Sequence, residues 1–152
     1  MGMICRALGY DMKVALVRFL NGEQQTGEDL FLDSNPNVVS AHMESGFTWN
    51  TQDQELDKKL ANETWIEAEK FLADPEINLV VLDEITYMIN YKYLDERSIL
   101  KALSNRPEGQ HVVITGRAAS QGIIEASDTV SEVKDIKHAF RANIRAQKGI
   151  DL

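Results

Sequence analysis

The chain has 152 residues and a mass of 17.1 kDa, which favours a single domain over residues 1–152, because two cores of about 75 residues would each be marginal. Apolar types make up 43% of the chain and charged types 26%, values typical of a soluble globular protein rather than a disordered one. The net charge of −8 opposes binding to nucleic acid or to an anionic membrane, and no apolar run reaches the roughly 18 residues of a membrane span. We therefore expect a soluble, cytoplasmic protein that binds neither nucleic acid nor membrane.

The predicted elements alternate between helices and strands along the chain. Residues 1–9 are typical of the last turns of a helix that ends at Gly9. Apolar runs rich in valine predict strands at residues 13–20, 78–82 and 111–115, and a weaker run predicts a fourth at 129–133. Helical periodicity predicts helices over residues 52–72, 95–105 and 120–126, the first with Thr51 and Gln54 at capping-box spacing. This alternation predicts an α/β fold with a parallel sheet.

Charge is distributed unevenly between the body of the chain and its end. Residues 134–148 carry five basic side chains and one acidic one, Asp135, although the chain as a whole is acidic. Residues 134–152 are therefore expected to form a basic C-terminal tail.

Two acidic residues follow the apolar run Leu79–Leu82. Asp83 and Glu84 would lie at the carboxyl end of a buried strand, where open α/β sheets bind their ligands. This is the Walker B arrangement, in which a carboxylate positions Mg²⁺ on the phosphates of a nucleotide. The alternative is a strand that simply ends in a solvated acidic turn.

A phosphate-binding loop of the form Gly-x-x-x-x-Gly-Lys-Ser/Thr is not found in the 152 residues. Gly22 and Gly27 have the required glycine spacing, but Glu28 and Asp29 follow where a lysine and a hydroxyl are needed. Two carboxylates at those positions would repel a triphosphate, so this chain does not contain the Walker A half of a nucleotide site.

Three further motifs could contact a ligand, and each has a structural alternative. Phe47 and Trp49, in a loop after Gly46, could present flat apolar faces or could pack under the helix that contains Trp65. Thr115-Gly116-Arg117 follows a predicted strand, where the guanidinium suits a bidentate phosphate contact but could equally form a surface salt bridge. Lys137-His138-Ala139-Phe140 could draw a polyphosphate toward the sheet, or could be part of a solvated tail.

The three histidines have no spacing that indicates a metal site or a catalytic triad.

Taken together, these motifs resemble the ATP:corrinoid adenosyltransferases of the CobA type over essentially the whole chain. The matching segments are 46–49, 80–87, 91–94, 105–107, 115–117, 130–132, 137–140 and 146–150.

The resemblance implies a P-loop NTPase-like, RecA-like fold, a homodimer, and the substrates ATP and a corrinoid. In such enzymes a Co(I) corrinoid attacks the 5′ carbon of ATP and releases triphosphate, with the electron supplied by a reductant protein such as a flavoprotein. Phe47 and Trp49 match the aromatic residues that hold off the lower axial ligand of cobalt, and are the expected catalytic residues. Glu84 matches the acid that binds Mg²⁺. Asp83, Thr115, Arg117, Lys137 and His138 are the expected nucleotide-binding residues.

The sequence also departs from the family pattern. Family members begin with a strand and a loop ending Gly-Lys-Thr-Thr, whereas this chain starts inside the helix that follows that loop. Arg18 replaces a usual glutamine, and Ala118 stands where glycine is common.

A missing strand inside the sheet would leave two strand edges unpaired in a buried place. The chain could therefore be a shortened version of a complete enzyme, or could close its sheet in another way.

We expect this chain on its own to transfer adenosyl at a negligible rate. The alternatives are a non-catalytic corrinoid-binding or dimer-partner protein and, less favoured, an unproductive fragment.

Overall fold

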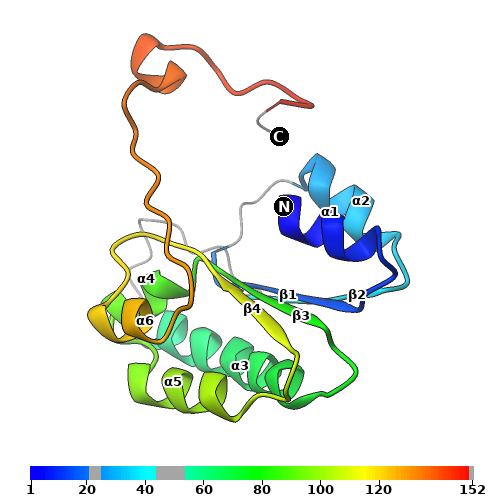
Figure 1. Cartoon of the computed structure of the whole chain (residues 1–152). Coiled ribbons are helices and arrows are strands. Elements are labelled where there is room, and N and C mark those ends of the chain that lie inside the picture. Colours follow the sequence, from blue (N-terminus) through cyan, green and yellow to red (C-terminus); the bar gives the residue numbers. More distant parts are fainter. Residues whose placement is uncertain (21–24, 44–53, 151–152) are drawn as a thin grey trace.

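The computed structural model describes residues 1–20, 25–43 and 54–150, and its centre is a four-stranded sheet (Figure 1). The strands are β1 (Val14–Arg18), β2 (Val38–His42), β3 (Leu79–Asp83) and β4 (His111–Ile114). They are all parallel and lie in the order β2-β1-β3-β4. Strand β2 was not predicted from the sequence, whereas the other three fall within two residues of their expected bounds.

The sheet contains no internal gap. Strand β1 pairs directly with β3, and Arg18 at the end of β1 lies opposite Asp83 at the end of β3. Strand β3 in turn pairs with β4. Among the described residues, the four strands are consecutive neighbours, so the buried, unpaired strand edges that a missing internal strand would leave are not found.

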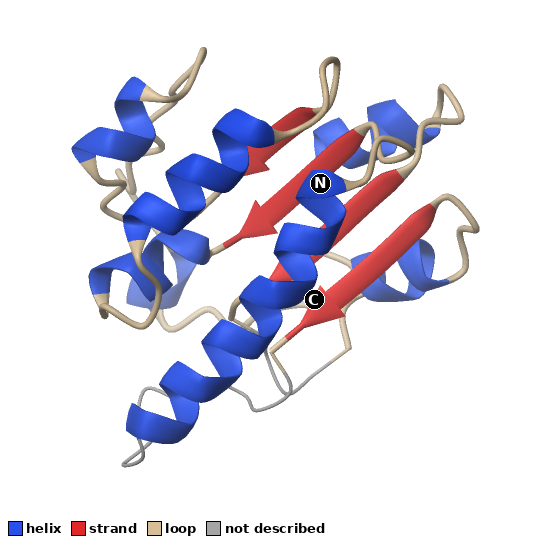
Figure 2. Cartoon of the chain, turned by 90° about the horizontal axis from the view of Figure 1, so that it is seen from below, coloured by secondary structure: helices blue, strands red, loops and turns tan. Residues whose placement is uncertain are grey.

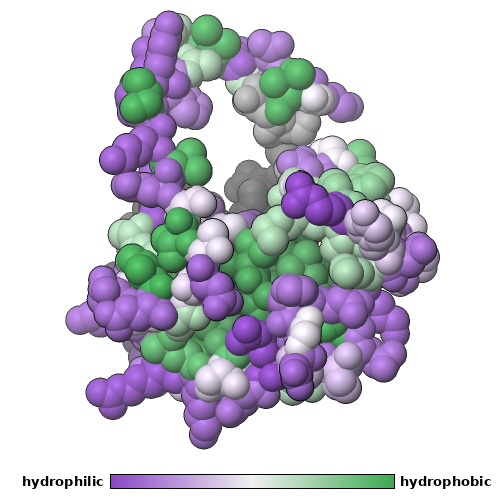
Figure 3. Space-filling model, viewed as in Figure 1, coloured by the Kyte–Doolittle hydropathy of each residue, from purple (hydrophilic) through white to green (hydrophobic). Residues whose placement is uncertain are grey.

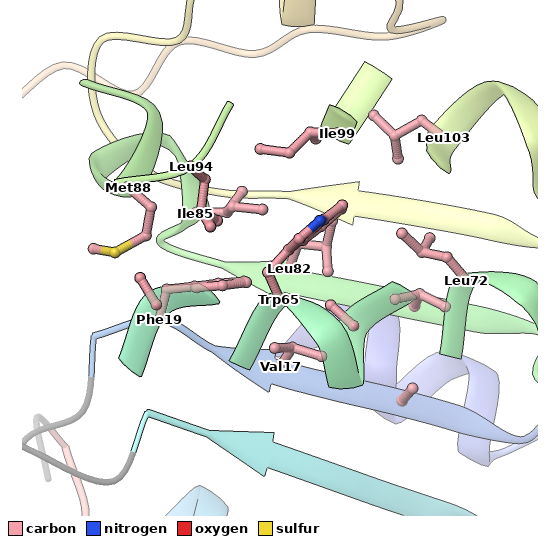
Figure 4. Close-up of a cluster of buried hydrophobic side chains, with 14 of the residues drawn as sticks. Val17, Phe19, Trp65, Leu72, Leu82, Ile85, Met88, Leu94, Ile99 and Leu103 are labelled. Carbon is pink, nitrogen blue, oxygen red and sulfur yellow. The ribbon is translucent and has the colours of Figure 1, made fainter. Parts of the chain in front are cut away.

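One face of the sheet is covered by α3 (Gln54–Ala73), α4 (Ile85–Asn90), α5 (Glu96–Asn105) and α6 (Gln121–Glu125), as Figures 1 and 2 show. Alternate strand residues point to this side, so Val17 and Leu82 join Trp65 of α3 in the larger apolar core (Figure 4). Trp65 is 6% exposed and Leu82 is fully buried. The long helix was predicted from its stripe of apolar residues; Thr51 of the expected capping box lies outside the described residues.

The opposite face is covered by the short helices α1 (Gly2–Leu8) and α2 (Gly27–Asp33). Ile4, Ala7 and Leu32 pack there against Leu16 and Val81, the strand residues that alternate with those of the larger core. Helix α1 ends before Gly9, as predicted, although Gly9 keeps a right-handed conformation.

Helix α2 was not predicted from the sequence. Thr26 caps it and accepts from the Asp29 amide, while the Asp29 side chain accepts from the Thr26 amide. Glu28 and Asp29, the two acids that make this segment unsuitable as a phosphate-binding loop, therefore lie in the first turn of a helix.

The prediction of a strand at residues 129–133 is wrong. Residues 128–150 lie outside the sheet as an exposed arm that leaves the body after α6 and contains one short 3₁₀ helix, η1 (Ala139–Ala142). Val133 is 95% exposed, and the sheet formed by the described residues contains none of residues 129–133. Figure 3 shows the arm as a largely hydrophilic segment with separate apolar side chains, above the apolar surface between the two helical layers.

Candidate functional site at the carboxyl edge of the sheet

Asp83 and Glu84 mark the point where β3 ends and α4 begins. Asp83 is the last residue of the strand and Glu84 precedes the helix, and both side chains are partly buried. Glu84 has a φ of 60°, in the left-handed region that costs a residue with a Cβ about 1–2 kcal/mol. This backbone turn places both acids at the carboxyl edge of the sheet, as the sequence predicted.

Thr115, the residue after β4, joins this pair of acids. Its hydroxyl donates to Asp83 Oδ1 at 2.7 Å and accepts from the Glu84 amide at 2.9 Å. Its own amide donates to the carbonyl of Leu82 at 3.1 Å. The ends of β3 and β4 are therefore cross-linked through one side chain, and the orientation of Asp83 is fixed by it.

The partly buried carboxyl groups of Asp83 and Glu84 interact electrostatically at this edge of the sheet. Burial raises the pKa of Glu84 above its ordinary value, and the negative charge of Asp83 raises it further. The Arg117 guanidinium acts in the opposite direction and lowers the pKa of Glu84. The charge of Arg117 therefore acts on Glu84, although the Arg117 side chain is itself exposed.

A cavity of about 530 Å³ opens at this edge of the sheet, between α1 and the carboxyl ends of β1, β3 and β4, and neither Glu84 nor Arg117 is among the residues that line it. Asp83 and Thr115 line it from the sheet, and Met1 and Gly2 line it from the start of α1. Cavities of this size accommodate small ligands in other proteins.

The cavity also contains an ion pair that sequence reasoning missed. Arg18 at the end of β1 pairs with Asp29, and both line the cavity with Thr26. Burial raises the pKa of Asp29, but hydrogen bonds from Thr26 and the charge of Arg18 outweigh this, so that the pKa is lowered overall. Arg18 was noted in the sequence only as a departure from the family pattern; its position at the end of a predicted strand was the available signal.

Four of the predicted site residues lie together, and the others do not join them. Asp83, Glu84, Thr115 and Arg117 form one cluster at the sheet edge. Lys137 and His138 are on the exposed arm and do not line the described cavity. Phe47 and Trp49 lie outside the described residues.

His138 has a local structural role on the arm. Its Nδ1 accepts from the amide of Phe140 at 3.1 Å and caps the short 3₁₀ helix.

The donor set at this edge suits a hard divalent cation that retains other ligands. The described residues contain no cluster of three or more His, Cys, Asp or Glu side chains that would enclose a metal ion. Mg²⁺, however, is commonly held by one or two carboxylates together with water and the phosphates of a substrate. Two crowded carboxylates, one with a raised pKa, are groups whose repulsion a divalent cation would relieve.

Comparison with known proteins identifies the family to which these features belong. The sequence model of the family described as ATP:corrinoid adenosyltransferase BtuR/CobO/CobP matches residues 1–152. The chain belongs to this family, which is a family of transferases.

Similar proteins include three bacterial corrinoid adenosyltransferases. The Pseudomonas aeruginosa protein is 48% identical over 151 residues, which cover 99% of this chain and 74% of that protein. The Escherichia coli K12 protein is 43% identical over 150 residues, and the Salmonella typhimurium protein, named corrinoid adenosyltransferase CobA, is 42% identical over 150 residues. Each of these two alignments covers 99% of this chain and 76% of the relative.

In the part of the chain that the structure describes, no helix combines the length and the apolar character needed to cross a membrane.

Proposed function

We propose that the chain binds the Mg²⁺–triphosphate part of ATP for transfer of the 5′-deoxyadenosyl group to a Co(I) corrinoid. The observation that carries the proposal is the cluster of Asp83, Glu84 and Thr115 at the carboxyl edge of a parallel sheet, beside a cavity of about 530 Å³. Ligands bind at this edge in open α/β sheets. Membership of the adenosyltransferase family supports the choice of ATP and a corrinoid as substrates.

Each residue of the cluster has a distinct part in this proposal. Glu84 would hold Mg²⁺, with Asp83 oriented beside it by the Thr115 hydroxyl. The bound cation would supply charge neutralisation of the triphosphate leaving group. Arg117 would contact the phosphates from the turn after β4, where a guanidinium can donate two parallel hydrogen bonds to phosphate oxygens.

The transfer moves the 5′-deoxyadenosyl group from the triphosphate of ATP to the cobalt of the corrinoid. The electron pair of Co(I) forms the cobalt–carbon bond to the 5′ carbon of ATP, the bond from that carbon to the triphosphate oxygen breaks, and triphosphate leaves with the electron pair. We propose that Phe47 and Trp49 shape the corrinoid side of the site, as the family resemblance implies. On the same resemblance, we propose that Lys137 and His138 contact the phosphates. We also propose that the chain has a P-loop NTPase-like fold, forms a homodimer, and receives its electron from a separate reductant protein such as a flavoprotein.

We further propose that the 152-residue chain assayed alone transfers adenosyl at a negligible rate. Its sequence contains no Gly-x-x-x-x-Gly-Lys-Ser/Thr segment, and the backbone amides and lysine of such a loop supply much of the affinity for triphosphate in P-loop proteins. Steady turnover in a reduced-corrinoid assay, at a rate like that of the P. aeruginosa relative, would contradict this part of the proposal.

Titration with cob(II)alamin tests the proposal against a non-catalytic corrinoid-binding protein. The absorption spectrum of cob(II)alamin is recorded with increasing protein, with and without MgATP. A spectral shift that requires MgATP supports the enzyme, because the corrinoid site would then depend on the nucleotide. A shift of equal size without MgATP would favour a corrinoid-binding protein.

A further inference from the structure

The turn that follows β4 has an unusual backbone that is fixed from outside. Within residues 115–118, Gly116 has a φ of +141° and Ala118 has a φ of +51°. Left-handed values of this kind are uncommon for alanine and require support from surrounding groups. The turn carries Arg117, which belongs with Asp83, Glu84 and Thr115 to the cluster at the sheet edge.

Two side chains of α4 provide that support by donating to the same carbonyl oxygen. Thr86 Oγ1 donates to the Arg117 carbonyl at 2.9 Å, and Asn90 Nδ2 donates to it at 3.1 Å. Asn90 Nδ2 also lies 3.3 Å from the carbonyl oxygen of Ala118. Thr86 and Asn90 are four residues apart and therefore lie on the same side of the helix.

Thr86 also contacts the turn at a second point. A Cβ added to Gly116 would overlap the Thr86 hydroxyl and would lie 3.3 Å from its Cγ2. Thr86 itself is 2% exposed, so it has little room to move away. Gly116 therefore allows the backbone of the turn to approach Thr86 closely enough for the hydrogen bond to form.

The same short stretch of chain holds both ends of the turn. At one end, Thr115 bonds to Asp83 and to the Glu84 amide. At the other, the Arg117 carbonyl bonds to Thr86 and Asn90, two and six residues after Glu84. The backbone position of Arg117 relative to the two acids is thus set by hydrogen bonds to a single strand-to-helix segment, residues 83–90.

We propose that Thr86 and Asn90 are positioning residues that hold Arg117 for binding of the triphosphate. They act through the backbone of the turn and contact no phosphate themselves. The inference rests on the proposed function, because it assigns the triphosphate of ATP as the ligand of Arg117.

The first test measures whether the turn is held, independently of any ligand. Trypsin cleaves after arginine, and the carbonyl of the Arg117–Ala118 bond is the one that Thr86 and Asn90 hold. Cleavage of this bond, followed by mass spectrometry, is compared in wild type, Thr86→Val and Asn90→Ala. Loss of this partly buried hydrogen bond, at about 1.4 kcal/mol, corresponds to about a tenfold change in the open population, so we expect cleavage about tenfold faster in Thr86→Val.

Two further variants separate this effect from general loss of stability. Thr64→Val is the matched control, because Thr64 is 6% exposed and its hydroxyl also donates to a carbonyl, that of Leu60 within α3, at 2.9 Å. Thr86→Ser keeps the hydroxyl and should restore the wild-type cleavage rate. Equal cleavage in wild type and Thr86→Val, or equal acceleration in Thr64→Val, would overturn the inference.

The second test is a double-mutant cycle on the affinity for magnesium tripolyphosphate, measured by calorimetry. Thr86→Val should weaken binding about fivefold to tenfold in the wild-type background. It should have no further effect in the Arg117→Ala background, because Thr86 acts only through Arg117.

The outcomes distinguish this inference from the proposed function. Additive losses from Thr86→Val and Arg117→Ala would overturn the inference and leave the proposed function intact. Absence of tripolyphosphate binding by the wild-type chain would overturn the proposed function and, with it, the role assigned to Thr86 and Asn90.

Discussion

Replacing Thr115 with valine removes a hydroxyl that links the ends of β3 and β4. Valine has nearly the same shape, so the change deletes the hydroxyl without leaving a large cavity. Two hydrogen bonds are lost: the one donated to Asp83 Oδ1 at 2.7 Å and the one accepted from the Glu84 amide at 2.9 Å. The Glu84 backbone then has less support for its left-handed conformation.

The expected decrease in the free energy of unfolding is large because one of the two lost hydrogen bonds is made to a carboxylate, that of Asp83. A hydrogen bond to a carboxylate contributes about 1.5–3 kcal/mol and one between neutral groups about 0.5–1.5 kcal/mol. Because Asp83 and Glu84 are only partly buried, water replaces part of the two lost hydrogen bonds. We therefore expect Thr115→Val to lower the free energy of unfolding by about 2–3 kcal/mol in total. For a domain of this size that corresponds to a decrease in Tm of about 4–12 °C.

Urea denaturation of Thr115→Val, Thr115→Ser and Thr64→Val tests this prediction. Thr115→Ser keeps both hydrogen bonds and should cost less than about 1 kcal/mol. Thr64→Val removes a single bond between neutral groups within α3 and should cost about 1 kcal/mol. If Thr115→Val costs no more than Thr64→Val, the cross-link between the strand ends contributes nothing beyond an ordinary hydroxyl, and the reasoning is refuted.

Three other substitutions test neighbouring parts of the site. Gly116→Ala should destabilise the chain by more than about 2 kcal/mol in urea denaturation, because the new Cβ meets Thr86 at a φ of +141°; a neutral result would contradict the close contact. Ala118→Gly should raise stability by about 0.5–1 kcal/mol, since relief of a left-handed alanine outweighs the greater freedom of glycine in the unfolded chain. Glu84→Gln should raise the Tm at pH 7 without Mg²⁺. Burial and the charge of Asp83 raise the pKa of Glu84 in the folded chain, so the contribution of Glu84 to stability is full only below the pKa that it has in the unfolded chain. This contribution is lost as the pH rises through the folded pKa, whereas glutamine stays neutral. The advantage of Glu84→Gln should shrink at about pH 4, and an advantage that grows on acidification would contradict the sign of this pKa shift.

The sequence predicted the part of the site that lies at the ends of strands. Leu79–Leu82 is apolar because both faces of β3 are covered, so the first polar residues, Asp83 and Glu84, mark the edge of the sheet. The same reasoning located Thr115 after β4. Strand β2 was missed because Val38–His42 is short and largely exposed at the sheet edge, so no continuous apolar run marks it.

Other features depend on contacts that no local pattern specifies. Residues 129–133 have strand-forming side chains, but a strand needs a paired neighbour, and this segment has none among the described residues. The Arg18–Asp29 pair and the support of Arg117 by Thr86 join residues that are distant in the sequence. The departure at Ala118, noted from the sequence, has a structural correlate in its φ of +51°, a conformation that glycine adopts more easily.

The central claim is that Glu84 holds the magnesium of a bound nucleotide, and calorimetric titration with ATP in the presence and absence of Mg²⁺ tests it most directly. The matched control is Glu63→Gln, an exposed glutamate of α3 whose partner is Lys59. We expect Mg²⁺-dependent binding in wild type and in Glu63→Gln, and an affinity at least about tenfold lower in Glu84→Gln. Equal Mg²⁺-dependent affinity in all three proteins would contradict the claim.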